Sequence, residues 1–238
     1  MKTTLLLTVI TLGLALQSLP AAETATNQPA RMVIIGDSTV CNYPENSVQR
    51  GWGMFIQGHF NSNELQVINL ALSGRSTKTF IKEGHWAGAL KEKPDFVLIQ
   101  FGHNDSHTPD HPEATDANTT YPQYLRQYID ESRASGARPV LITPMCRRVF
   151  LTNGLIDNAL LPYANAMKAV AQEKQVPLVD LNTASVRLCN QLGPDASKAL
   201  ANNPTDPTHF NEKGATTMAG LVMQELPLVE PTLKSFLK

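Results

Sequence analysis

Residues 31–39 read RMVIIGDST, an apolar run that ends in a glycine and three polar residues. A short continuous apolar run of this kind is typical of a strand that is buried on both faces of a sheet. Gly36 lets the backbone turn sharply, and Asp37 and Ser38 are residue types that favour the first turn of a helix. The segment therefore predicts a buried strand at Arg31–Ile35 that ends in a polar turn.

Four more apolar runs of this kind occur, at Leu65–Leu70, Phe96–Gln100, Pro139–Ile142 and Leu178–Leu181. Together with the first run they predict five buried parallel strands. Helical patterns lie between and after them, at Trp52–Phe60, Thr77–Lys91 in one or two pieces, Tyr121–Ser135, Leu160–Lys174 and Asn211–Glu225. This alternation predicts a three-layer α/β sandwich with right-handed crossovers.

The composition is that of a chain with one buried core. It has 238 residues, of which 42% are hydrophobic, and this amount supports one domain of roughly 200 residues. We expect the domain to span residues 31–238, after a short segment at 23–30. The formal net charge of -1 leaves no basic excess for nucleic acid or anionic lipid, so neither partner is expected.

The N-terminus has the pattern of a secretory signal peptide. Lys2 supplies the charged start, Leu5–Leu16 is largely apolar, and Pro20–Ala22 resembles a cleavage region. A permanent transmembrane anchor is the alternative, but the apolar run is shorter than the roughly 20 residues that span a bilayer. We therefore expect residues 1–22 to be removed, which predicts a secreted or periplasmic protein with no membrane attachment.

Three cysteines, Cys41, Cys146 and Cys189, would enter an oxidising compartment after export. At most one internal disulfide can form, and the sequence leaves all three pairings open. The alternative is that all three are small buried apolar residues.

Polar residues with catalytic potential follow three of the predicted strands. Ser38 lies just past the first strand, Gly74 past the second and Asn104 past the third, while Asp206 and His209 precede the closing helix. Because parallel strands bring their carboxyl ends to one edge, where open α/β sheets bind ligands, we expect these residues to meet there.

Their chemistry matches nucleophilic catalysis on an ester. Ser38 is the candidate nucleophile, His209 its general base, and Asp206 the carboxylate that orients the imidazole. The amides of Ser38 and Gly74 and the side chain of Asn104 are candidate donors for an oxyanion hole.

Three histidines, His103, His107 and His111, recur at every fourth position, which on a helix could place metal ligands on one face. Pro109 and Pro112 interrupt the stretch, so no helix should run through it. Loop polarity or substrate contact is therefore expected, and no metal site is predicted.

These residues resemble the SGNH hydrolase family, also called the GDSL family, whose four signature residues match Ser38, Gly74, Asn104 and His209. Thr39 stands where the family name has leucine, a departure that resembles the rhamnogalacturonan acetylesterase branch. Further matches to that branch are RGWG at 50–53, GRST at 74–77, KPD at 93–95 and QFGHND at 100–105.

The resemblance implies a flavodoxin-like sheet of strand order 2-1-3-4-5, an open active site and catalysis without a cofactor. It also implies deacetylation of plant cell-wall polysaccharide, with pectic rhamnogalacturonan expected as substrate. Separately, we expect the protein to be a monomer, although the sequence does not establish the oligomeric state. Acetylated xylan and acetylated oligosaccharides are the alternative substrates.

A pectic substrate carries uronate carboxylates, which need cationic partners near Ser38. Arg75, Arg147 and Arg148 are the candidates, with His103 as a further candidate for substrate contact. The alternative for the arginines is surface solvation or structural ion pairs.

Two functions of other classes fit the same scaffold. A carbohydrate-binding protein without turnover would keep the groove but would need neither Ser38 nor His209. A nucleotide or phosphate binder could use the turn at Gly36–Thr39 as an anion site. Such a binder would not require Asp206 and His209, so their presence favours the enzyme.

Overall fold

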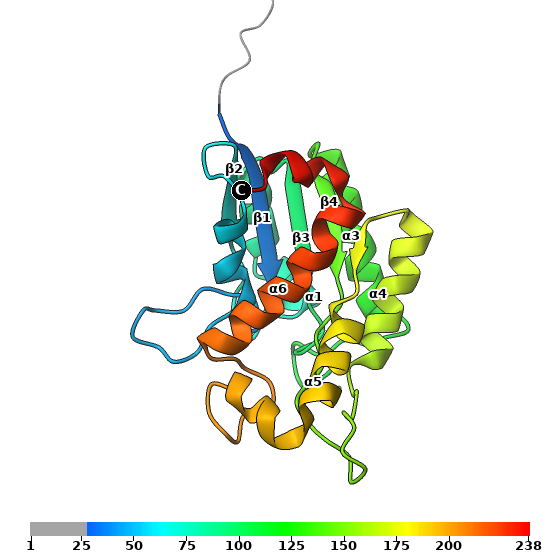
Figure 1. Ribbon diagram of the computed structural model, residues 1–238. Helices are drawn as coiled ribbons and strands as arrows, with labels where there is room; N and C mark the ends of the chain where they lie inside the picture. The colour runs from blue at the N-terminus through cyan, green and yellow to red at the C-terminus, as the bar shows by residue number, and fades with distance from the viewer. Residues whose placement is uncertain (1–27) are drawn as a thin grey trace, which may run out of the picture.

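Five parallel strands form the centre of the computed structural model, which describes residues 28–238 (Figure 1). They are β1 (Ala30–Gly36), β2 (Leu65–Asn69), β3 (Phe96–Gln100), β4 (Arg138–Ile142) and β5 (Leu178–Val179). The strand order is β2-β1-β3-β4-β5, with all four neighbouring pairs parallel. The predicted sheet and its order are confirmed.

Alternate residues of the strands enter two separate cores. Met32 and Ile34 of β1 belong to one core, whereas Val33 and Ile35 belong to the other, and all four are fully buried. This alternation follows from the two-residue period of a strand, and the continuous apolar runs show that both faces are covered. The three-layer sandwich expected from the sequence is therefore confirmed.

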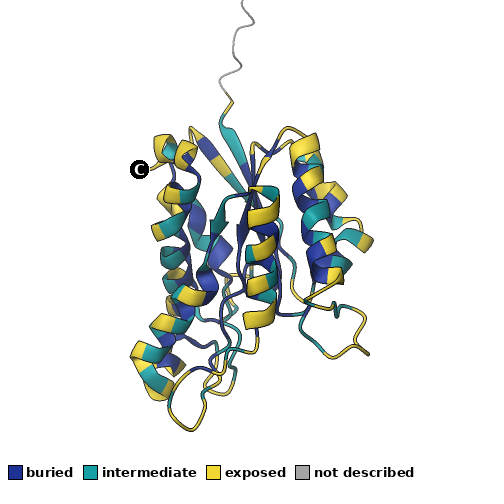
Figure 2. Cartoon of the chain, turned by 90° about the vertical axis from the view of Figure 1, so that its right-hand side faces the viewer, coloured by how far each residue is buried: buried dark blue, intermediate teal, exposed yellow. Residues whose placement is uncertain are grey.

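The helices divide between the two faces of the sheet. The face that carries Met32 is covered by η1 (Trp52–His59), α5 (Leu181–Ser197), α6 (Glu212–Val229) and η3 (Pro231–Phe236). The other face is covered by α1 (Thr77–Lys82), α2 (His85–Lys91), α3 (Thr120–Ala134) and α4 (Leu161–Lys174). Figure 2 shows these helices with buried residues facing inward and exposed residues outward.

Several element boundaries are set by identifiable residues. The helical stretch after β2, predicted in one or two pieces, forms two helices, because Gly84 with its positive φ of 81° ends α1 and begins α2. The segment at Trp52–His59 is a 3-10 helix. Strand β5 stops at Val179 because the Asp180 side chain caps α5, accepting a hydrogen bond from the Thr183 amide at 3.2 Å.

The helix α5 was not predicted. It contains Gly193, whose φ of 74° is non-helical, followed directly by Pro194. These residues break the pattern that marks a helix in sequence, and the short η2 (Lys198–Leu200) follows. The helix lies near the carboxyl ends of the strands, at the lower edge of the sheet in Figure 1.

Cys41, Cys146 and Cys189 are all buried free thiols. Cys146 and Cys189 belong to one small apolar cluster with Ile156. The structure thus matches the alternative in which the cysteines act as small buried residues.

Within residues 28–238, no helix combines the length and the apolar character that crossing a membrane requires. The expected signal peptide lies outside the described residues.

Candidate active site

The Ser38 turn begins where β1 ends. A Cβ atom on Gly36 would lie 2.6 Å from the Gln100 carbonyl oxygen, so only glycine fits there. Asp37 braces the turn, because its Oδ1 accepts hydrogen bonds from the amide and hydroxyl of Thr39 at 2.9 and 2.7 Å. Ser38 therefore occupies the start of one helical turn at the carboxyl edge of the sheet, with 6% of its surface exposed.

The Ser38 hydroxyl meets a histidine from the far end of the chain. Ser38 Oγ lies 2.9 Å from His209 Nε2, and His209 Nδ1 lies 2.8 Å from Asp206 Oδ2. Asp206 Oδ1 also accepts hydrogen bonds from the amides of Thr208 and His209, at 2.7 and 2.9 Å. The three predicted residues thus form a continuous hydrogen-bonded chain.

The Asp206 carboxylate is held in its ionised form. Burial raises the pKa of Asp206, but the hydrogen bonds from the amides of His209 and Thr208 and from the His209 ring outweigh burial and bring this pKa below its usual range. An ionised carboxylate at Nδ1 favours the tautomer in which that nitrogen carries the proton. His209 Nε2 is then the acceptor that faces the Ser38 hydroxyl.

The candidate oxyanion donors come together on neighbouring loops. Gly74 follows β2 with a φ of +78°, a conformation that other residues rarely adopt. The Asn104 side-chain amide donates a hydrogen bond to the Arg75 carbonyl at 3.0 Å, which joins the loop after β3 to the loop that holds Gly74. Since this amide has two N–H groups, one remains for a ligand.

His103 and Asp37 form a buried pair, and each directly precedes a candidate donor residue in the sequence. His103 Nδ1 is 3.2 Å from Asp37 Oδ2, and the two side chains are 3% and 0% exposed. Burial raises the pKa of Asp37, but the interactions with His103 and the hydrogen bonds from Thr39 outweigh it and lower the pKa. The structure therefore gives His103 a buried partner in place of the substrate contact expected from the sequence.

Arg148 was a candidate partner for a substrate carboxylate, but the structure places it differently. Only 9% of its surface is exposed, and its Nη2 donates to the carbonyls of Asp206 and His209 at 3.0 and 2.7 Å. Its guanidinium carbon lies 4.6 Å from the centre of the Phe210 ring. The Arg148 side chain thus stabilises the loop that carries Asp206 and His209, and it is not placed to bind a substrate carboxylate.

Arg75 and Arg147 lie beside the loops that carry Gly74 and Asn104. Arg75 is 39% exposed, and it donates to Glu83 Oε2 at 2.8 Å and to the Ser73 carbonyl at 3.0 Å. Arg147 is half-buried, and its Nη2 donates to the His103 carbonyl at 3.0 Å. Both keep further N–H groups beyond these contacts.

Asp105, next to Asn104, is a buried residue that sequence reasoning did not single out. Its carboxyl group accepts hydrogen bonds from the Thr77 amide and hydroxyl and from the Thr115 hydroxyl. Burial raises its pKa to about 7, although these hydrogen bonds act in the opposite direction. Asp105 thereby ties the Asn104 loop to the start of α1.

Comparisons with known proteins agree with this geometry. Probable rhamnogalacturonan acetylesterase YesY of Bacillus subtilis (strain 168) is 39% identical over 211 residues, which cover 84% of this chain and 96% of the relative. Rhamnogalacturonan acetylesterase RhgT of the same organism is 36% identical over 225 residues, which cover 88% and 95%.

The solved structure of YxiM from Bacillus subtilis superimposes with a TM-score of 0.75 at 30% identity, covering 85% of this chain and 57% of YxiM. Residues 34–216 match the family described as GDSL-like Lipase/Acylhydrolase. This match includes the carboxyl ends of all five strands and the loop that carries His209. The chain therefore belongs to the GDSL-like lipase/acylhydrolase family and is a carboxylic ester hydrolase.

Proposed function

We propose that this protein is an exported esterase that removes O-acetyl groups from pectic rhamnogalacturonan by an acyl-enzyme mechanism. The observation that carries the mechanism is the chain of contacts from Ser38 Oγ through His209 to Asp206. The names of the two relatives, both rhamnogalacturonan acetylesterases, support the substrate.

In the first half-reaction, Ser38 Oγ attacks the acetyl carbonyl carbon while its proton passes to His209 Nε2. Asp206 stabilises the resulting imidazolium. The C–O bond to the sugar then breaks, and His209 returns the proton to the departing sugar oxygen. The acetyl group is left on Ser38.

In the second half-reaction, water gives its proton to His209 and attacks the acetyl carbonyl. His209 then returns this proton to Ser38 Oγ as the bond between Oγ and the acetyl carbon breaks. Acetic acid leaves and ionises to acetate, and the serine hydroxyl is restored. In both tetrahedral intermediates the oxyanion is stabilised by the amides of Ser38 and Gly74 and by the Asn104 side chain. These donors are fixed by the fold, so little reorganisation is needed as the charge develops.

Arg75 and Arg147 are the residues we assign to the uronate carboxylates. Arg75 follows Gly74 on the loop after β2, and Arg147, on the loop after β4, contacts the His103 carbonyl next to Asn104. Both retain donors beyond their contacts within the chain. Arginine can bind a carboxylate through two parallel hydrogen bonds. Losing the correct arginine should therefore cost about 1.5–3 kcal/mol on the uronate polymer and little on a small neutral ester.

The substrate assignment is tested by measuring acetate release from acetylated rhamnogalacturonan, acetylated xylan and a chromogenic acetate ester. We expect the pectic polymer to be preferred, and Arg75→Ala or Arg147→Ala to reduce that preference selectively. Ser38→Ala is the inactive control for all three. Preference for xylan, with no selective effect of either arginine, would contradict the pectic assignment but leave the esterase intact.

Export is tested separately. Mass spectrometry of the protein recovered from the culture medium and periplasm of the native host should find a mature N-terminus near Ala22. Recovery of the protein only from the cytoplasm, with Met1 to Ala22 intact, would contradict this part of the proposal.

A further inference from the structure

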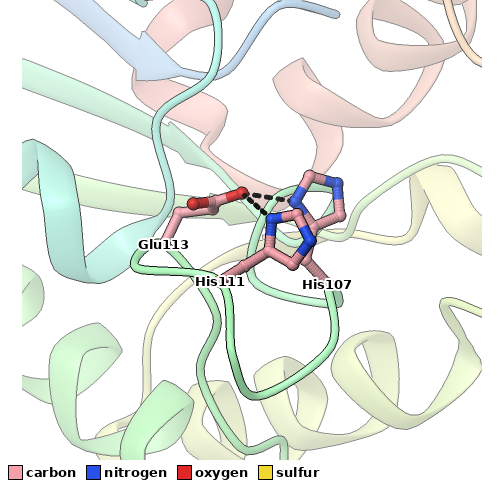
Figure 3. A group of neighbouring side chains, drawn as sticks. All are labelled: His107, His111 and Glu113. Atoms are coloured by element: carbon pink, nitrogen blue, oxygen red, sulfur yellow. Dashed lines mark hydrogen bonds and ion pairs between the residues drawn. The ribbon is translucent and has the colours of Figure 1, made fainter.

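Three side chains converge on the loop between β3 and α3. His107 Nδ1 lies 2.6 Å from Glu113 Oε1, and His111 Nδ1 lies 3.2 Å from the same oxygen. The two imidazole rings have centroids 5.2 Å apart (Figure 3). Two imidazoles and one carboxylate therefore face a common point.

The backbone brings these residues together through two consecutive turns. The His111 amide donates to the Thr108 carbonyl at 2.9 Å, and the Ala114 amide donates to the His111 carbonyl at 3.1 Å. Pro109 and Pro112 occupy the second position of these turns, where the fixed φ of proline is favoured. The prolines that exclude a helix are thus what places Glu113 opposite the histidines.

The base of the loop is closed by further contacts. The Thr115 amide donates to the Asp105 carbonyl at 3.0 Å, and the Thr115 hydroxyl donates to the Asp105 carboxyl group at 2.9 Å. The Tyr163 hydroxyl, from α4, contacts the carbonyls of both residues at 3.0 and 2.6 Å. The three converging side chains consequently project from a braced loop.

We propose that His107, His111 and Glu113 bind a divalent transition-metal ion of the zinc type. Candidate ligand atoms of the three residues all lie within 4.8 Å of one another. Zinc takes imidazole nitrogen and carboxylate oxygen at about 2.0–2.2 Å, which places neighbouring ligand atoms roughly 3–3.5 Å apart. Small side-chain rotations are enough to reach that geometry.

The donor set also selects the class of ion. Imidazole suits zinc, copper and nickel, whereas magnesium and calcium favour sites made of oxygen atoms alone. The side chains of His107 and His111 are 37% and 51% exposed, so solvent can deliver the ion and water can complete its coordination. Glu113 is 17% exposed, which keeps it at the base of the site.

This site differs from the metal hypothesis considered for the sequence. A site of that kind would place His103 with His107 and His111 on one face of a helix, which Pro109 and Pro112 exclude. In the structure His103 is buried against Asp37, and Glu113 takes the third position.

Zinc binding is tested by titrating the full-length mature protein, without an affinity tag, with ZnCl2 and separately with MgCl2 in a calorimeter. His107→Ala, His111→Ala and Glu113→Gln should each weaken zinc affinity by at least about tenfold. His85→Ala is the matched control, because His85 lies 3.0 Å from Glu83 in a surface pair with a single imidazole.

We expect one zinc ion per chain in the wild type and in His85→Ala, no binding of magnesium at the same concentrations, and a higher melting temperature with zinc. Absence of zinc binding would overturn the proposal. It would also be overturned by binding that persists unchanged in the three loop variants, or that His85→Ala weakens equally.

Discussion

His103 Nδ1 lies 3.2 Å from Asp37 Oδ2, and each of these two buried residues directly precedes a residue of the candidate oxyanion hole. Asp37 is followed by Ser38 and His103 by Asn104. The pair joins the turn after β1 to the loop after β3, so it sets the separation between the Ser38 amide and the Asn104 side chain.

Substitution of His103 should therefore affect the transition state more than substrate binding. We expect His103→Ala to lower kcat on a small acetate ester by roughly 10- to 100-fold, with KM nearly unchanged, because the oxyanion donors lose their spacing. His103→Asn should recover part of kcat, since its amide can replace the Nδ1–H group. A variant that folds and shows a raised KM at unchanged kcat would contradict this role.

Arg148 should stabilise the loop that carries Asp206 and His209 and should not bind the substrate. Arg148→Lys keeps the charge but loses the planar group that contacts the carbonyls of Asp206 and His209. We expect the free energy of unfolding to fall by about 1–3 kcal/mol and kcat to fall roughly tenfold on polymer and small ester alike.

Arg133→Lys is the control for Arg148, because Arg133 also donates to two carbonyls, those of Lys174 and Gln175, at an exposed site. It should leave kcat unchanged. If Arg148→Lys lost activity only on the uronate polymer, Arg148 would be a substrate ligand after all.

Asn104 should contribute only as negative charge develops on the substrate oxygen. Asn104→Ala removes one oxyanion donor, so we expect kcat to fall by roughly 10²- to 10³-fold with a much smaller change in KM. Steady-state kinetics on the small acetate ester separate the two parameters. A large rise in KM with kcat preserved would move Asn104 into ground-state binding.

Asp105 should make stability depend on pH. Its pKa is raised by burial to about 7, from an ordinary value of 3.8. Between these values the folded state keeps a proton that the unfolded state has lost, so the free energy of unfolding should fall as pH rises, by on the order of 4 kcal/mol from this group.

Urea denaturation at several pH values between 4 and 8 measures this effect. Asp105→Asn cannot lose a proton, so its stability should be lower in absolute terms but should decline less between pH 4 and 7. Equal slopes for wild type and Asp105→Asn would exclude a raised pKa at this position.

The sequence was sufficient for the sheet because the strands are short, largely apolar runs. The edge strand β2 is the least regular of them, with Gln66 exposed and only Leu65 fully buried. It was also sufficient to predict that Ser38 and Asn104 lie at one edge, because the carboxyl ends of parallel strands meet there. His209 was expected at the same edge because its loop directly precedes the closing helix. The contact between Ser38 and His209 joins residues far apart in the chain, so its 2.9 Å distance came only from the structure.

The sequence could not predict roles that depend on the direction in which a side chain points. In the sequence, Arg147 and Arg148 are indistinguishable neighbours. The structure shows that Arg147 contacts the His103 carbonyl, whereas Arg148 contacts the carbonyls of Asp206 and His209. Likewise, Pro109 and Pro112 excluded a helical arrangement of the histidines, but the sequence did not show that turns at these prolines bring Glu113 to His107. The kinked helix α5 was not predicted because a Gly-Pro pair, here Gly193-Pro194, is typical of a loop.

The most direct test of the mechanism is mass spectrometry of the enzyme quenched in acid during turnover of an acetate ester. We expect one added acetyl group on the peptide that contains Ser38, and neither adduct nor turnover in a folded Ser38→Ala variant. In serine hydrolases, loss of the nucleophile reduces the rate by about 10⁴-fold or more. Turnover that persists in Ser38→Ala at near the wild-type rate would contradict it.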